Sequence, residues 1–114
     1  MNRDALGAGP GPWPDRRRYR RVPARLACVV RVAGSSRQAA GTIVDISLGG
    51  ARACLPVGIP VGAVVDIDIA SPLLRLRGRV VRVVSSWRCD DIAVRFDSTS
   101  PAADLTLRTL VAGL

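Results

Sequence analysis

Two short groups of polar residues carry the chemistry that this sequence can do. The first lies in the arginine-rich stretch 15–21, DRRRYRR, in which Arg17 and Arg21 stand four positions apart. The second is the stretch 45–50, DISLGG, which begins with Asp45 and includes Ser47. A guanidinium group presents five donors in a planar fork that fits phosphate oxygens or the O6/N7 edge of guanine, and a carboxylate can accept from guanine N1–H and N2–H2. The two groups together predict a pocket for an anionic guanine nucleotide.

Each group on its own has a plainer explanation. An arginine run is commonly a solvated segment that attracts anions without selecting among them. Asp45 and Ser47 can be polar residues on the wet face of a strand, or can stabilise a turn through bonds to nearby backbone. Gly49 and Gly50 indicate a turn with positive φ under either interpretation. The nucleotide hypothesis therefore depends on both groups occurring in one chain.

The composition describes a single domain that favours anionic partners. A chain of 114 residues, 48% of them hydrophobic, is long enough for one buried core and too short for two. Its 17 cations are all arginine and its 9 anions are all aspartate, which gives a formal net charge of +8. No apolar run approaches the roughly 20 residues that span a bilayer, and the first residues lack the apolar core of a secretory signal. We therefore expect a cytoplasmic protein with no membrane insertion.

The sequence does not indicate catalysis or metal binding. It contains no histidine and no glutamate, and its cysteines, Cys28, Cys54 and Cys89, are widely spaced without a C-x-x-C pair. This pattern argues against a zinc site and against a disulfide framework, and it favours three small apolar side chains in or near the core of a protein in a reducing compartment. Since there is also no phosphate loop and no nucleophile with a base, we expect no enzymatic activity, no metal and no cofactor.

The strands that must position the polar groups are predicted from alternating apolar residues. Residues 1–14 are rich in glycine and proline and are expected to form a flexible tail. A first strand follows Arg21, with Leu26, Cys28, Val30 and Val32 on its inner face. In a second strand Val44 and Ile46 are expected to face inward while Asp45 and Ser47 project together from the outer side.

The rest of the chain predicts four more strands and a helix. Alternation continues through 51–55, 64–69, 74–84 and 92–96, and the phase slips at 80–81, where a β-bulge is expected. Near the C-terminus Ser100 can cap a helix that begins at Pro101 and carries Ala103, Leu107, Leu110, Val111 and Leu114 at helical spacing. Consecutive antiparallel strands joined by tight turns favour a small barrel closed by one helix.

The motifs and their order resemble the PilZ domains, a family of bacterial receptors for cyclic di-GMP. That family carries R-x-x-x-R and then [D/N]-x-S-x-x-G at the end of a barrel strand. Arg17 and Arg21 fit the first motif, and Asp45, Ser47 and Gly50 fit the second. The pairs Arg16 with Arg20 and Arg21 with Arg25 have the same spacing, but family members typically place a hydrophobic residue after the second arginine, here Val22. The stretches 76–81 and 94–96 also look like family strands, so the resemblance runs from 16 to about 110.

This resemblance implies both a fold and a ligand. The expected fold is all-β-dominated, a six-stranded antiparallel PilZ-type β-barrel with a C-terminal α-helix, formed by residues 15–114. The arginines would pair with phosphate, bond the guanine edge and stack on the ring, while the aspartate would hold the guanine donor edge. The glycines would let backbone approach the ligand or adopt the turn. The implied cyclic di-GMP-binding residues are Arg16, Arg17, Arg21, Asp45, Ser47, Gly49 and Gly50.

The function that the resemblance implies is that of a receptor without catalytic activity. It would bind one or two molecules of cyclic di-GMP, as a monomer or a ligand-dependent dimer, and relay the signal to a downstream protein partner in motility, biofilm or exopolysaccharide control. One alternative is a PilZ-fold interaction module that acts without nucleotide, against which the intact motifs count. Another is nonspecific RNA or DNA binding, which the scarcity of aromatic residues for base stacking disfavours. The sequence predicts no role for Trp13 or Trp87.

Overall fold

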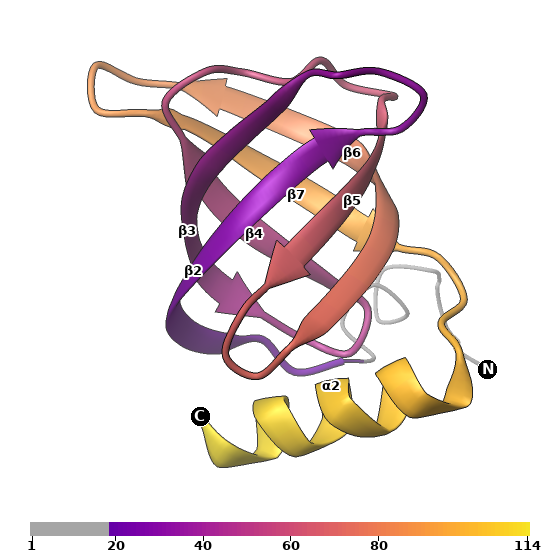
Figure 1. The fold of residues 1–114 in the computed structure, drawn as a ribbon. Coiled ribbons are helices and arrows are strands. Elements are labelled where there is room, and N and C mark those ends of the chain that lie inside the picture. Colours follow the sequence, from indigo (N-terminus) through magenta and orange to yellow (C-terminus); the bar gives the residue numbers. More distant parts are fainter. Residues whose placement is uncertain (1–18) are drawn as a thin grey trace, which may run out of the picture.

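The computed structural model describes residues 19–114 and shows a closed barrel of six antiparallel strands with one helix across one end (Figure 1). The elements are β2 (Val22–Val32), β3 (Gln38–Ile46), β4 (Gly50–Leu55), β5 (Val64–Ile69), β6 (Leu74–Ser85), β7 (Asp90–Phe96) and α2 (Pro101–Gly113). Around the barrel the order is β2-β3-β4-β7-β6-β5, and pairing of β2 with β5 closes it. The fold expected from the sequence is confirmed.

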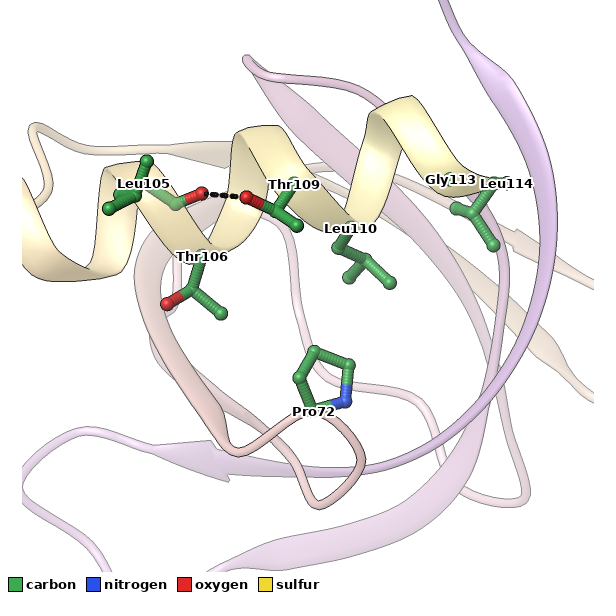
Figure 2. Close-up of a pocket in the computed structure, with 7 residues that line it drawn as sticks. All are labelled: Pro72, Leu105, Thr106, Thr109, Leu110, Gly113 and Leu114. Atoms are coloured by element: carbon green, nitrogen blue, oxygen red, sulfur yellow. Dashed lines mark hydrogen bonds between the residues drawn. The ribbon is translucent and has the colours of Figure 1, made fainter.

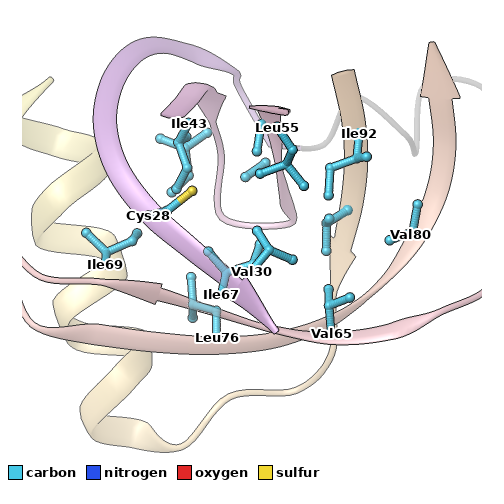
Figure 3. Packing of buried hydrophobic residues seen from close by; sticks show 14 of the residues in the cluster. Cys28, Val30, Ile43, Leu55, Val65, Ile67, Ile69, Leu76, Val80 and Ile92 are labelled. Carbon is cyan, nitrogen blue, oxygen red and sulfur yellow. The ribbon is translucent and has the colours of Figure 1, made fainter. Parts of the chain in front are cut away.

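Alternating side chains of all six strands meet inside the barrel and form its core (Figure 3). Burial follows the predicted period of two in most strands, most regularly along β5 and the first half of β6. Fully burying a valine, leucine or isoleucine contributes about 1.5–3 kcal/mol, so this core supplies most of the drive for folding. The largest fully buried side chains are Val30, Ile43, Ile46, Leu55, Val65, Ile67, Ile69, Leu76, Val80, Ile92 and Leu107.

Three strands contain a register shift, of which the sequence predicted one, and the shift in β2 falls between Pro23 and Leu26. In β6 the shift falls between Val80 and Arg82, where the phase slip indicated a bulge. The third lies in β3, where Ile43 pairs with Ala53 on β4 and Asp45 pairs with Arg52, so that Val44 is the extra residue. The prediction that Val44 faces inward with Ile46 is therefore wrong. Because of the bulge, the inward-facing partner of Ile46 is Ile43, which is fully buried.

Helix α2 covers the end of the barrel that holds the β3–β4 and β5–β6 turns (Figure 1). Ser100 caps it as predicted, because its hydroxyl accepts the backbone N–H of Ala103 at 3.1 Å. Leu107 is fully buried against the barrel, whereas Leu114, expected on the same face, ends the helix with 45% of its surface exposed. Within residues 19–114, α2 lacks the length and apolar content that a membrane-crossing helix needs.

The opposite end of the barrel is formed by three connections, 33–37, 56–63 and 86–89, and is called the loop end below (Figure 1). The cysteines at this end correct a prediction. Cys54, in β4, and Cys89, just before β7, form a disulfide with a Cα–Cα distance of 5.6 Å, whereas the sequence argued against one. Only Cys28 is the buried apolar thiol that was expected of all three, and burial raises its pKa. Spacing along the chain could not reveal the pair because β4 and β7 become neighbours only through the barrel's strand order.

Candidate functional site

A chain of ion pairs crosses the outer wall of the barrel from β2 to β7. Arg21, immediately before β2, donates from Nη1 to Oδ1 of Asp45 at 3.1 Å. The other carboxylate oxygen of Asp45 accepts from Nε of Arg52 at 2.9 Å, and Arg52 also donates to Asp91 at 3.0 Å. The order Arg21, Asp45, Arg52, Asp91 therefore alternates in charge across three neighbouring strands. Arg21 and Asp45, which stand 24 positions apart in the sequence, are the predicted residues of the two separate motifs that the structure brings into direct contact.

Strand register explains this arrangement. The bulge at Val44 sets Asp45 opposite Arg52 in the β3–β4 ladder, so both side chains leave the same face of the sheet. On its other side β4 pairs with β7, which sets Asp91 diagonally across from Arg52. A β3 without the extra residue would place Asp45 out of step with Arg52. The bulge therefore aims the carboxylate that the sequence singled out.

Asp45 is a half-buried carboxylate whose two oxygens are both occupied. Its side chain is 16% exposed, whereas that of Arg21 is 59% exposed and that of Arg52 38%. The hydrogen bond to Asp45 raises the pKa of Arg52, so this guanidinium stays fully charged. Asp45 is therefore an acceptor held in place by one partly exposed cation from β4 and by one more exposed cation from the chain before β2.

Ser47 lies in the turn rather than beside Asp45. It is 6% exposed, its Oγ accepts the backbone N–H groups of Gly49 and Gly50 at 3.1 Å each, and its own N–H donates to the Gly50 carbonyl at 2.8 Å. The expectation that Ser47 projects outward with Asp45 is wrong, because the chain leaves the strand after Ile46 and turns the hydroxyl onto its own backbone. Serine and aspartate commonly stabilise turns in this way.

Positions 49 and 50 favour glycine because other parts of the chain approach them closely, and neither residue has a positive φ angle. Among residues 19–114 the glycines with positive φ are Gly34 and Gly62, so the predicted left-handed turn at 49–50 is wrong. A Cβ on Gly50 would lie 2.4 Å from the Val94 carbonyl oxygen, across the β4–β7 ladder. A Cβ on Gly49 would lie 2.7 Å from the ring of Tyr19. Both glycines therefore let other parts of the chain pack tightly on the turn.

The remaining predicted residues, Arg16 and Arg17, lie outside the described part of the chain. The structure shows that Tyr19 packs its ring over Gly49 and that Arg21 reaches Asp45, so the segment leading into β2 lies along the β3–β4 turn. Beside this contact an open cavity of about 570 Å³ is lined by Tyr19, Leu48, Gly49, Phe96, Asp97, Ser98, Thr99, Pro101 and Asp104. The turn and the start of α2 thus frame a hollow beside Tyr19, and the charged residues of its lining are Asp97 and Asp104.

Sequence reasoning missed two members of this site, Arg52 and Tyr19. Arg52 occupies the outward parity of a strand whose inward residues are Ala51 and Ala53, and that parity is readable from the sequence. Its pairing with Asp45 is not, because it depends on the unpredicted bulge. Tyr19 stood inside the arginine-rich stretch, and nothing in the sequence indicated that its ring covers Gly49.

A second hollow involves none of the predicted residues. A groove of about 490 Å³ runs between α2 and the β5–β6 turn, lined by Pro72, Leu105, Thr106, Thr109, Leu110, Gly113 and Leu114 (Figure 2). Its lining carries no charge, so it does not suit an anionic nucleotide. Residues 19–114 also contain no group of three or more cysteine or aspartate side chains that could hold a metal ion.

Comparison with known proteins gives one family and a set of similar folds. A family model described as PilZ domain matches residues 15–113. No curated protein matches the chain. The PilZ domain of YcgR from Escherichia coli, solved with c-di-GMP, superposes with a TM-score of 0.68 at 18% identity, covering 87% of this chain and 91% of that one. The inhibitor of motility MotI/DgrA of Bacillus subtilis gives a TM-score of 0.71 at 16% identity over 86% of this chain, which spans 50% of that protein.

A third similar structure is the PilZ domain of CeSA from a cellulose-synthesizing bacterium, with a TM-score of 0.64 and 23% identity over 82% of this chain and 95% of that one. The chain also spans only 45% of YcgR in its complex with c-di-GMP. At these identities the likeness is one of fold.

Proposed function

Because this chain belongs to the PilZ domain family, we propose that it is a receptor for cyclic di-GMP that binds its ligand along the Arg21–Asp45 contact. The observation that carries the proposal is the 3.1 Å bond between these two side chains, since it unites the two motifs that are separate in the sequence. Structures of similar fold, YcgR and MrkH, were solved with c-di-GMP. The described chain supplies a cation and an acceptor of the kinds that a guanine nucleotide needs.

The ion pair between Arg21 and Asp45 would be exchanged for contacts with the ligand. An exposed pair of this kind contributes about 0–1 kcal/mol, so breaking it costs little. Arg21 could then bond a phosphate or the O6/N7 edge of guanine, and the freed oxygen of Asp45 could accept the N1–H or N2–H2 donors. Arg52 would stay on the second oxygen and hold the carboxylate in place. Arg16 and Arg17 are proposed as further contacts on the basis of the motif.

Ser47, Gly49 and Gly50 would contribute through the shape of the turn. Ser47 fixes the two glycine N–H groups, and the glycines admit the ring of Tyr19 and the backbone of β7. In this proposal these residues set the position of Asp45 and of the segment before β2, and the ligand contacts come from the charged side chains. This assignment differs from the direct ligand contact that the family resemblance implied for Ser47.

The signal is proposed to pass to a protein partner without any catalytic step. Binding of cyclic di-GMP would reposition the segment before β2 on the β3–β4 turn, next to the start of α2, and so alter the surface at this end of the barrel. The family resemblance supports a cytoplasmic role in motility, biofilm or exopolysaccharide control. Binding of one or two ligand molecules, to a monomer or to a ligand-dependent dimer, is compatible with this arrangement.

Calorimetric titration with cyclic di-GMP, with GTP as control ligand, tests the proposal. The protein should bind cyclic di-GMP saturably, and Arg21→Ala and Asp45→Ala should each weaken binding by about ten- to a hundredfold, as expected for the loss of a hydrogen bond to a charged group. Arg75→Ala is a matched control, because it removes an exposed arginine whose partner, Asp68, lies on another wall of the barrel. Absence of heat from folded protein, or equal weakening by all three variants, would contradict the proposal.

A second candidate is a PilZ-fold interaction module that acts without nucleotide. The observation in its favour is that both oxygens of Asp45 are already bonded to arginines. In such a module the ion pairs would be permanent and would hold the segment before β2 on the barrel. The same titration separates the two candidates, because the module would give no heat with cyclic di-GMP while Asp45→Ala would still lower its stability.

A further inference from the structure

Exposed apolar side chains gather at the loop end of the barrel, away from α2 and the β3–β4 turn. Trp87, at the tip of the β6–β7 connection, is 90% exposed, and Val84 at the end of β6 is 55% exposed. In the β4–β5 connection Val57 is 55% and Val61 62% exposed. Single exposed hydrophobic residues are ordinary, but four at one end of the barrel form a patch that something can cover.

Bonds between the three connections fix this patch in shape. The Cys54–Cys89 disulfide ties the tip of the β6–β7 connection to the end of β4. Gly58 lies against Asp90, so close that a Cβ there would fall 2.5 Å from the carboxylate, and its carbonyl accepts from Arg37 at 3.3 Å. A surface held in one conformation loses little entropy when it binds.

The loop end also carries a net positive charge, because in the described part of the chain four arginines there make no ion pair and one unpaired carboxylate, that of Asp90, lies among them. Several arginines elsewhere on the barrel are paired, for example Arg75 with Asp68 and Arg77 with Asp66, while Arg25 in β2 and Arg95 in β7 make no ion pair with any described residue. At the loop end Arg37 and Arg79 donate to the backbone carbonyls of Gly58 and Gly62. The guanidinium of Arg88 lies 5.2 Å from the Trp87 ring centroid. Within residues 19–114, the arginines at this end that make no ion pair are Arg37, Arg79, Arg82 and Arg88.

We propose that the loop end docks peripherally on an anionic lipid bilayer, with Trp87 entering the headgroup region. Tryptophan is favoured at membrane interfaces, and arginines close to an anionic leaflet are each attracted to it. The apolar side chains stand on two projecting connections, 56–63 and 86–89, and on the end of β6, which suits insertion between lipid headgroups better than a protein pocket. Such a contact needs no membrane-spanning segment. It goes beyond the proposed function, because no nucleotide takes part in it.

Docking in this way would orient the molecule. The loop end and the Arg21–Asp45 contact lie at opposite ends of the barrel, since β3 runs from the 33–37 connection to the β3–β4 turn (Figure 1). With Trp87 in the headgroups, the β3–β4 turn and α2 would face the aqueous phase. The candidate nucleotide site would therefore stay accessible on a docked molecule.

Vesicle binding of the full chain, without nucleotide, tests this inference. In a Trp13→Phe background Trp87 is the only tryptophan, so its fluorescence reports on the loop end alone. With vesicles of equal parts phosphatidylcholine and phosphatidylglycerol, its emission should shift to the blue and be quenched by lipids brominated on the acyl chain. Phosphatidylcholine vesicles should give a much smaller signal, and added salt should weaken the binding.

Variants with matched controls locate the contact. In vesicle sedimentation Trp87→Ala should weaken binding about tenfold, whereas Leu73→Ala, which removes an 88% exposed residue at the α2 end, should not. Arg82→Ala should weaken binding about fivefold, and Arg75→Ala should have a much smaller effect because Asp68 already neutralises that charge.

Three outcomes would overturn the inference. The first is an unshifted, unquenched Trp87 on vesicles that carry bound protein, since the arginine-rich stretch 15–21 would then be making the contact. The second is equal weakening by Trp87→Ala and Leu73→Ala. The third is Trp87-dependent binding to an acidic protein surface with no binding to vesicles. A chain that binds vesicles but not cyclic di-GMP would refute the proposed function and leave this inference standing.

Discussion

Opening the Cys54–Cys89 disulfide should strongly destabilise the barrel. The two cysteines are separated by 35 positions, and closing a loop of that length removes chain entropy from the unfolded state equivalent to about 4 kcal/mol at 25 °C. Domains of this size are typically stable by about 5–15 kcal/mol, so the bond contributes a large share. We therefore expect Cys54→Ser/Cys89→Ser to lower the free energy of unfolding by about 3–4 kcal/mol without unfolding the protein.

Urea unfolding, followed by far-ultraviolet circular dichroism, measures this loss. Oxidised wild type should unfold at a higher urea concentration than wild type kept in dithiothreitol, and the reduced protein should match the double variant. The double variant is also the control, because reductant should leave its unfolding curve unchanged. Thiol titration of denatured, oxidised wild type should find only Cys28 free.

Two results would refute this reasoning. One is a titration that finds all three thiols free after treatment with oxidised glutathione, which would mean that Cys54 and Cys89 do not pair. The other is a disulfide that forms but changes the free energy of unfolding by much less than 1 kcal/mol. In that case the unfolded chain must already hold β4 close to the β6–β7 connection, because the entropy argument assumes an open loop.

Three further predictions concern the turn and the barrel wall. Ser47→Ala should lower stability by about 1–3 kcal/mol in urea unfolding, because it leaves two backbone N–H groups of a half-buried turn without their acceptor, while Ser47→Thr should recover most of the loss. Gly50→Ala should lower stability by about 1–3 kcal/mol through the clash with the β7 backbone, whereas Gly113→Ala, where a Cβ meets nothing within 4 Å, should be neutral or slightly stabilising. The hydrogen bond from Arg77 lowers the pKa of Asp66 in the folded protein. The pair therefore stabilises the protein at pH values above the unfolded-state pKa of about 3.9, and this stabilisation is lost as the pH falls through the lower pKa of the folded state. Asp66→Asn should therefore reduce stability at neutral pH and flatten its fall in acid; an unchanged acid profile would show that the pair contributes nothing.

Much of the barrel was predictable because its strands alternate cleanly. Residues 64–69 and 74–80 place apolar side chains at every second position, and each strand formed with that face inward. The helix was predictable for the same local reason, since Ser100 and Pro101 provide a start signal and Leu107 lies on the expected face. Local pattern decides local structure where one face is buried against a single core.

The site was only partly predictable, because its geometry depends on contacts between strands. Asp45 and Arg21 could be named from their motifs, but the role of Arg52 required the register shift at Val44, which leaves no mark in the alternation. Ser47 was assigned the wrong direction, because a strand parity extended past the last strand residue does not describe a turn. The disulfide was missed in the same way, since Cys54 and Cys89 meet only once β4 and β7 are neighbours.

Closure of the sheet between β2 and β5 limits how this domain can recognise another protein. Within residues 19–114 every strand has a hydrogen-bonded neighbour on both sides, so no edge is open to a strand contributed by a partner. Recognition must instead use side chains on the wall, the helix and the connections, which can be replaced without disturbing the backbone ladder. One such barrel can therefore acquire new specificities while its architecture stays constant. This agrees with the low sequence identity, 16% and 18%, between this chain and two proteins of similar fold.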